Sequence, residues 1–144
     1  HFRQAFDHFL TWCNEGCPNA YEMFAWSEND WRQLDCELRL KEIDEHDDRV
    51  RWMLDHWQNF QQIYCNLLGL DKVISLDKAV STLGETFDGQ MHDALWDARN
   101  TSKLYVLSTK KEEFRDIMQP IIDATKPAEP LTFSLADAFR AARK

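Results

Sequence analysis

The segment from residue 92 to residue 101 decides the fold, and it reads His-Asp-Ala-Leu-Trp-Asp-Ala-Arg-Asn-Thr. Two side chains five positions apart on one helix diverge by about 140°, because each residue turns the chain by about 100°. His92 and Asp97 can therefore face one site only if His92 lies in the loop before the helix. Asp93 would then be the N-cap of that helix. Asp97 would lie one turn further on, close to the positive end of the helix dipole.

Most of the remaining chain predicts helices, because apolar residues recur in it at helical spacing. The expected helices cover residues 2–13, 28–38, 58–68, 76–83, 94–107 and 111–124, with a stiff break at 126–130 and a last small helix from Ser134. The first helix begins at the start of the chain with no capping residue before it, which indicates a piece of a longer protein.

Two short segments are candidates for strands. Residues 20–26 are apolar, aromatic-rich and bounded by turn residues, which is typical of a mostly buried strand. In the ambiguous stretch that follows residue 49, the alternation of Val50, Trp52, Leu54 and His56 predicts a strand near 52–57. We therefore expect an α/β fold in which helices dominate.

Composition limits the class of protein. The chain has 144 residues, enough for one domain, and a net charge of −8. This charge disfavours a broad phosphate-binding surface, which needs clustered Lys and Arg. An acidic pocket that holds phosphates through divalent cations remains compatible with it. No apolar run approaches the roughly 20 residues of a membrane helix, and the start of the chain does not resemble a signal peptide.

The four cysteines favour free thiols. Cys13 and Cys17 lie four positions apart, but no second close pair of Cys or His follows Cys36 or Cys65, so a structural zinc site is disfavoured. Free thiols are typical of a reducing compartment, and we expect the protein to be cytoplasmic.

Residues 92–101 resemble the third motif of the DEDDh exonucleases, the DnaQ-like family with an RNase H-like fold. That motif is a histidine, four residues, and an aspartate followed by a small residue, often continuing Arg-Asn-Thr; residues 97–101 read Asp-Ala-Arg-Asn-Thr. The preceding segments 76–79 (Leu-Asp-Lys-Ala) and 87–89 (Phe-Asp-Gly) resemble the approach to the same motif. The resemblance covers roughly residues 2–110.

A second motif can be sought in the same register. Residues 24–34 resemble the strand-to-helix segment that carries the second metal-site aspartate of the family, and by that match Asp30 is this carboxylate. Ser27 and Glu28 stand where the family usually has Gly-Asp. Asn59 replaces an acid of the family, and we assign it no catalytic role. The first motif, an Asp-x-Glu on the first strand, has no counterpart ahead of Asp30.

The resemblance implies the helix-rich carboxyl-terminal part of an RNase H-like α/β fold, whose central mixed sheet is incomplete in this chain. The exonuclease-like domain would cover residues 1–125, with an extension over 126–144. The implied activity is removal of nucleotides from the 3′ end of RNA or single-stranded DNA, with two Mg²⁺ or Mn²⁺ ions. Asp30 and Asp97 would help to hold the metals, and His92 would be the catalytic base.

These residue types suit phosphodiester hydrolysis. Hard divalent cations prefer carboxylate oxygens, so acids from separate elements must converge at one point. A histidine, with a reference pKa of about 6.5, can accept the proton of the attacking water at neutral pH.

Two other hypotheses stay open. One is a non-catalytic binding or regulatory module on an exonuclease-like fold, favoured by the missing first motif. The other, weaker, is a helical interaction domain with a thiol-bound metal. The expected partners are a nucleic-acid 3′ end and the missing amino-terminal segment of the same domain. The high aromatic content also leaves room for an apolar surface patch and a homodimer.

Overall fold

The fold is seen in a computed structural model of the chain, which describes residues 1–16 and 18–125. Seven helices and two strands follow one another in these residues. In chain order they are α1 (Phe2–Asn14), β1 (Met23–Ala25), α2 (Glu28–Leu40), α3 (Asp48–Asp55), β2 (Trp57–Asn59), α4 (Phe60–Leu68), α5 (Leu76–Thr82), α6 (Ala94–Ser108) and α7 (Lys111–Thr125). The class is therefore α/β with a large excess of helix, as the sequence predicts.

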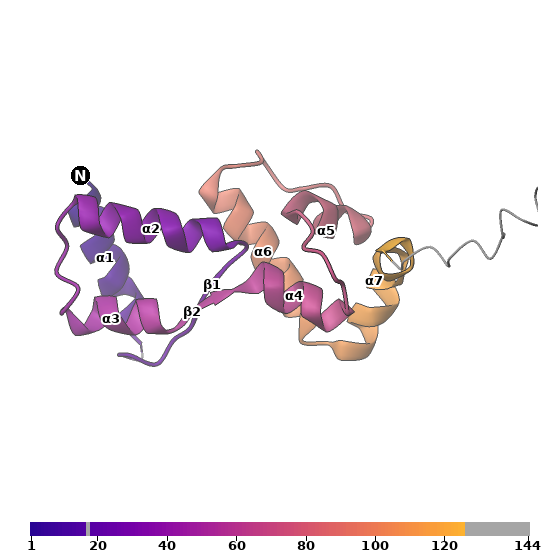
Figure 1. Cartoon of the computed structure of the whole chain (residues 1–144), viewed down its shortest axis with the longest axis horizontal. Helices are drawn as coiled ribbons and strands as arrows, with labels where there is room; N and C mark the ends of the chain where they lie inside the picture. The colour runs from indigo at the N-terminus through magenta and orange to yellow at the C-terminus, as the bar shows by residue number, and fades with distance from the viewer. Residues whose placement is uncertain (17, 126–144) are drawn as a thin grey trace, which may run out of the picture.

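The two strands form a small parallel sheet between two groups of helices (Figure 1). Met23 lies opposite Trp57 and Ala25 opposite Asn59 in the strand register. Helices α1, α2 and α3 lie on one side of this sheet and α4 to α7 on the other, so the described chain is elongated. Since neighbouring residues of a strand point to opposite faces, Met23 packs against the first group of helices and Phe24 against the second.

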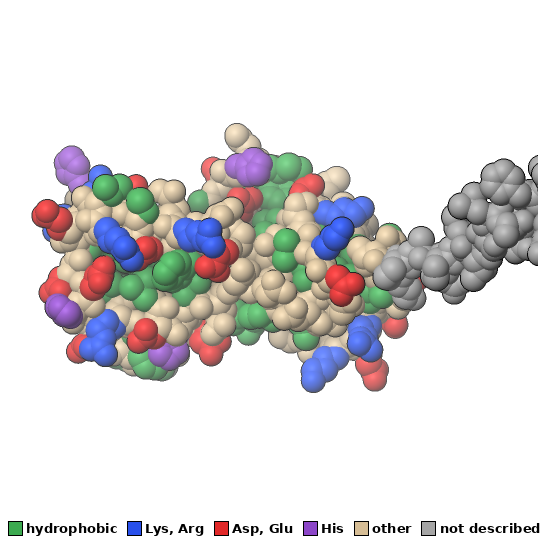
Figure 2. Space-filling model, viewed as in Figure 1, with side chains coloured by type: hydrophobic (Ala, Val, Ile, Leu, Met, Phe, Trp, Pro, Cys, Tyr) green, Lys and Arg blue, Asp and Glu red, His purple; other side chains and the backbone are tan. Residues whose placement is uncertain are grey.

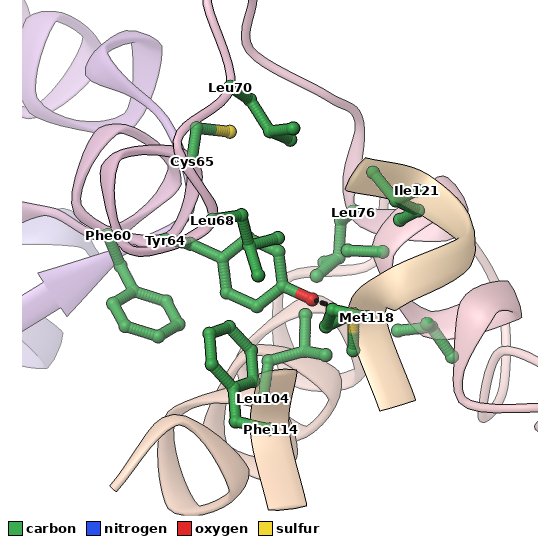
Figure 3. Close-up of a cluster of buried hydrophobic side chains, with 12 residues drawn as sticks. Phe60, Tyr64, Cys65, Leu68, Leu70, Leu76, Leu104, Phe114, Met118 and Ile121 are labelled. Atoms are coloured by element: carbon green, nitrogen blue, oxygen red, sulfur yellow. Dashed lines mark hydrogen bonds between the residues drawn. The ribbon is translucent and has the colours of Figure 1, made fainter. Parts of the chain in front are cut away.

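Each group of helices has its own hydrophobic core. The first is a small cluster contributed by α1, α2 and α3, consisting of Phe6, Leu10, Leu38, Val50 and Met53. Figure 3 shows the larger second core, in which Tyr64 of α4 points between side chains of α6 and α7. The Tyr64 hydroxyl donates a hydrogen bond to Sδ of Met118 at 2.9 Å, and burial raises the pKa of Tyr64. This core fixes α6, the helix that carries Asp97.

Local capping explains several helix ends that the sequence predicts. Helix α2 begins after Ser27, α4 ends at Gly69 in a left-handed conformation, and α6 begins after Asp93. Asn59 caps α4 by accepting a hydrogen bond from the amide of Gln62, which is a structural role. Three features of the sequence lie outside the described residues. They are Cys17, the break expected at 126–130 and the helix expected from Ser134.

The strand predicted near 52–57 is wrong for most of its length. Residues Asp48–Asp55 form helix α3, and the strand follows at Trp57–Asn59. The side chain of Asp47 caps this helix by accepting from the amide of Arg49 at 2.9 Å. Val50 and Met53, three positions apart, are the buried residues of the helix, so helical spacing and not alternation describes the buried face.

None of the described helices is both long enough and apolar enough to cross a membrane. Figure 2 shows acidic and basic side chains interspersed over the visible face of the molecule, with hydrophobic side chains reaching the surface between them.

Candidate functional site

A cleft of about 870 Å³ lies beside β1, where the amino-terminal ends of α2, α5 and α6 come together. Its wall is partly apolar, with Phe24 and Trp26 of the β1 segment and Phe87 of the loop before α6. Its titratable lining residues are Asp30, Asp77, His92 and Asp97, and no Lys or Arg among residues 1–16 and 18–125 lines it. The cleft is therefore acidic, which favours cations or ligands that bring cations with them.

His92 and Asp97 have the arrangement that the motif requires. His92 lies in the loop before α6 in a left-handed backbone conformation, with φ of 64°. The side chain of Asp93 caps α6, accepting from the amides of Leu95 at 3.0 Å and Trp96 at 3.4 Å. Asp97 is half-buried in the first turn of the helix. Both His92 and Asp97 line the cleft, as the sequence predicts for a histidine that precedes the helix.

Asp30 lines the same cleft from the first turn of α2. Its Oδ2 accepts hydrogen bonds from the amide of Ser27 at 3.1 Å and from the Ser27 hydroxyl at 3.2 Å. The residue thus closes the amino-terminal turn of α2 while its exposed carboxylate faces the cleft. Capping and ligand binding are compatible here because a carboxylate has two oxygens.

Asp77 is a lining residue to which the sequence analysis gave no role. It lies in the first turn of α5, and the neighbouring Ser75 hydroxyl lowers the pKa of its carboxyl, with His92 contributing in the same direction. Asp77 belongs to the segment 76–79 that resembles the approach to the motif, and the packing of α5 against α6 brings it to the cleft. The sequence shows only that Asp77 is an acid in the first turn of a predicted helix. Acids are common there because they interact favourably with the positive end of the helix dipole, so this feature alone does not indicate a site.

Asn100 and Lys103 of α6 hold the loop that leads to His92. Asn100 is 0% exposed, and its side-chain amide bonds both to the amide of Asp88, at 3.2 Å, and to the carbonyl of Asp88, at 3.1 Å. Lys103 pairs with the Asp88 carboxylate at 2.7 Å and with Glu85 at 3.4 Å. Within the Arg-Asn-Thr part of the motif, Asn100 therefore has a structural role, because its side chain holds the loop against α6.

Three carboxylates and an imidazole face the cleft, and donors of these types could hold a hard divalent cation. Among the described residues, however, no three His, Cys, Asp or Glu side chains are close enough together to hold a metal ion. The described residues of the cleft therefore do not by themselves form a complete site for a cation.

Comparison with known proteins adds no relative: no family model, no curated protein and no solved structure matches this chain.

Proposed function

We propose that this chain is the carboxyl-terminal part of a metal-dependent 3′–5′ exonuclease domain of the DEDDh type, with an RNase H-like fold. The observation that carries the proposal is that Asp30, His92 and Asp97, from segments far apart in the sequence, line one acidic cleft. The His-x4-Asp spacing alone does not require this convergence, because two residues five apart diverge on a helix.

The proposed substrate is the 3′ end of RNA or of single-stranded DNA. A cleft lined by carboxylates, with no Lys or Arg from the described part of the chain, repels a phosphodiester unless cations accompany it. Two bound Mg²⁺ or Mn²⁺ ions would activate the attacking water and offset the charge that develops on the phosphate. Asp30 and Asp97 would ligate them through carboxylate oxygens. An imidazole nitrogen of His92 would accept the proton from the water, because His92 is exposed and lines the cleft, and an imidazole is a common general base in proteins.

The small sheet supports the idea that a further strand belongs to the domain. Parallel sheets are nearly always larger and covered on both faces, and two strands alone are marginally stable. Residues 24–26 line the cleft and no residue of β2 does, so the cleft lies on the β1 side of the sheet. A strand with Asp-x-Glu, added at that edge, would bring its two carboxylates into the cleft beside Asp30 and Asp97. An in-frame segment of this kind in the coding sequence upstream would supply it.

The test is an assay of the complete domain, including that strand, with an end-labelled single-stranded oligonucleotide and Mn²⁺. Asp97→Asn should abolish hydrolysis, and His92→Ala should slow it by about 10²–10⁴-fold, the usual contribution of a general base. Asp116→Asn is the matched control, because Asp116 is an exposed acid of α7 that does not line the cleft. Equal activity of Asp97→Asn and Asp116→Asn would remove Asp97 from the site.

The second candidate is a binding or regulatory module that retains the fold without the reaction. It is favoured because, in the part of the chain that the structure describes, no three His, Cys, Asp or Glu side chains lie close enough together to hold one metal ion. The same assay distinguishes the two candidate functions. A binding module would bind the oligonucleotide without shortening it, whichever divalent cation is added.

A further inference from the structure

The backbone of the loop before His92 is bonded to a buried side chain of α6. Asn100 donates to the Asp88 carbonyl and accepts from the Asp88 amide, and it also donates to the carbonyl of Trp96 at 2.8 Å. A side-chain amide that satisfies both polar groups of one residue fixes that peptide against the helix. Asp88 is thus anchored four positions before His92.

Directly after Asp88, the loop passes under an aromatic ring. Gly89 has φ of 76°, and a Cβ at this position would lie 2.1 Å from Cδ2 and 2.4 Å from Cγ of Trp96. The guanidinium carbon of Arg99 lies 5.0 Å from the centroid of the same ring, an attractive cation–π arrangement. The atoms that a Cβ would meet belong to the inner part of a ring and not to the end of a flexible chain. Only glycine therefore fits under Trp96.

His92, three residues after Gly89, also has a left-handed backbone conformation, with φ of 64°. Left-handed conformations cost free energy in residues other than glycine, and they persist where the surrounding structure imposes them. His92 lies between two fixed points, the contacts of Asn100 with Asp88 on one side and the Asp93 cap on the other.

We propose that Gly89, Trp96 and Asn100 are positioning residues for His92: by fixing residues 88–92 on α6, they aim the imidazole into the cleft beside Asp97. This inference rests on the proposed function where it concerns catalysis, because it assigns His92 its place as the base. Its structural part concerns only the loop, and it can be tested without activity. A general base must lie within hydrogen-bond reach of the water that it deprotonates. A displacement of about 1 Å can cost about 10²-fold in rate.

Two glycines of the chain provide a matched pair of variants. Gly89→Ala adds a methyl group against Trp96, whereas Gly84→Ala adds one at a glycine with φ of 73° and no atom within 4 Å. Both substitutions impose the same left-handed strain, and only the first collides with the ring. The difference between them isolates the contact with Trp96.

The structural test uses the full chain, labelled for NMR. In Gly89→Ala, the Asp88 amide should exchange with solvent as fast as an unprotected amide and the imidazole signals of His92 should move. Gly84→Ala should leave both unchanged. Signals of Tyr64 and Phe60 report whether the core is intact; if Gly89→Ala does not fold, Trp96→Leu replaces it, with the same expected changes. A protected Asp88 amide and unmoved His92 signals in the folded variant would overturn the inference.

The catalytic test uses the complete domain. Gly89→Ala should lower kcat by about 10²-fold with KM unchanged, while Gly84→Ala should leave both constants unchanged. In a His92→Ala background, Gly89→Ala should have no further effect, because a residue that acts through His92 has nothing left to position. A decrease of equal size in both backgrounds would refute positioning. If the parent domain shows no hydrolysis, the proposed function fails, and the NMR comparison still decides the placement of the loop.

Discussion

His92 and Asp97 face one cleft from opposite sides of a single capping residue. Asp93 lies between them in the sequence and is the N-cap of α6. His92 is therefore outside the helix, and its side chain is not turned away from the cleft by the helical rotation. The cap at Asp93 thus lets two residues five positions apart line one cleft.

Replacing the cap should weaken the fold locally. We expect Asp93→Ala to lower the free energy of unfolding by about 0.5–2 kcal/mol, because two amides of the first turn lose their acceptor. Asp93→Ser, which retains a capping oxygen, should lose much less. Urea titration followed by circular dichroism measures both variants. Equal stability of Asp93→Ala and the parent chain would contradict the role of Asp93.

Asn100 should be among the most sensitive polar residues of the described chain. Asn100→Ala removes a side chain that is 0% exposed and leaves the part-buried amide and carbonyl of Asp88 without their partner, so we expect the free energy of unfolding to fall by about 1–3 kcal/mol. Asn66→Ala is the control, since Asn66 is exposed and accepts one hydrogen bond from Gln62; its effect should stay within about 0.5 kcal/mol. Chemical denaturation of the two variants, compared in one buffer, checks the difference.

The core under the site should respond as a close-packed interior. Leu104 of α6 is 0% exposed, and Leu104→Ala should cost about 2–5 kcal/mol through the cavity that it leaves. Val106 lies on the same helix and is 58% exposed, so Val106→Ala should change stability little. Thermal unfolding distinguishes them, and a similar melting temperature for both variants would be evidence against the packing of α6.

One prediction concerns pH. A hydrogen bond from Arg49 lowers the pKa of Asp47, the cap of α3, below its value in the unfolded chain. Ionised Asp47 therefore stabilises the fold above the unfolded pKa of about 3.9, and this contribution disappears as the pH falls through the lower folded value. The difference in free energy of unfolding between the parent chain and Asp47→Asn should be largest near neutral pH and should shrink below pH 4.

The partner of Asp47 provides the control for that experiment. In an Arg49→Gln background, Asp47→Asn should lose most of this pH dependence, because the cation that lowers the pKa is gone. If the pH dependence of the effect of Asp47→Asn on stability has the same size in the Arg49→Gln background, the effect belongs to another group. Arg49 also pairs with Asp7 of α1 at 3.0 Å, so its removal will lower overall stability in both members of the comparison.

Much of the fold follows from local signals in the sequence. The helices with an apolar stripe and a recognisable cap, such as α2 after Ser27 and α6 after Asp93, are predicted within a few residues. Helix α3 is missed because Val50, Trp52 and Leu54 fall at every second position, which favours a strand, although the apolar Met53 interrupts the alternation. Its helical conformation depends on packing of α3 against α1. Local patterns do not contain that contact.

The candidate site was predictable only in part, for a similar reason. The motif suggests that His92 and Asp97 belong together, and the resemblance adds Asp30. Asp77 and the ring of Trp96 over Gly89 depend on how α5 and the loop meet α6, which is tertiary information. The contact between Asn100 and Asp88, twelve positions apart, is likewise invisible in a local pattern.

The most direct test of the central claim is the fate of two labelled strands, one with a free 3′ hydroxyl and one with a blocked 3′ end, incubated with the complete domain and Mn²⁺. We predict that the free strand is shortened stepwise from its 3′ end, that the blocked strand stays intact, and that Asp97→Asn shortens neither. Cleavage inside the blocked strand, or shortening that persists in Asp97→Asn, would contradict the assignment of this cleft to a 3′–5′ exonuclease.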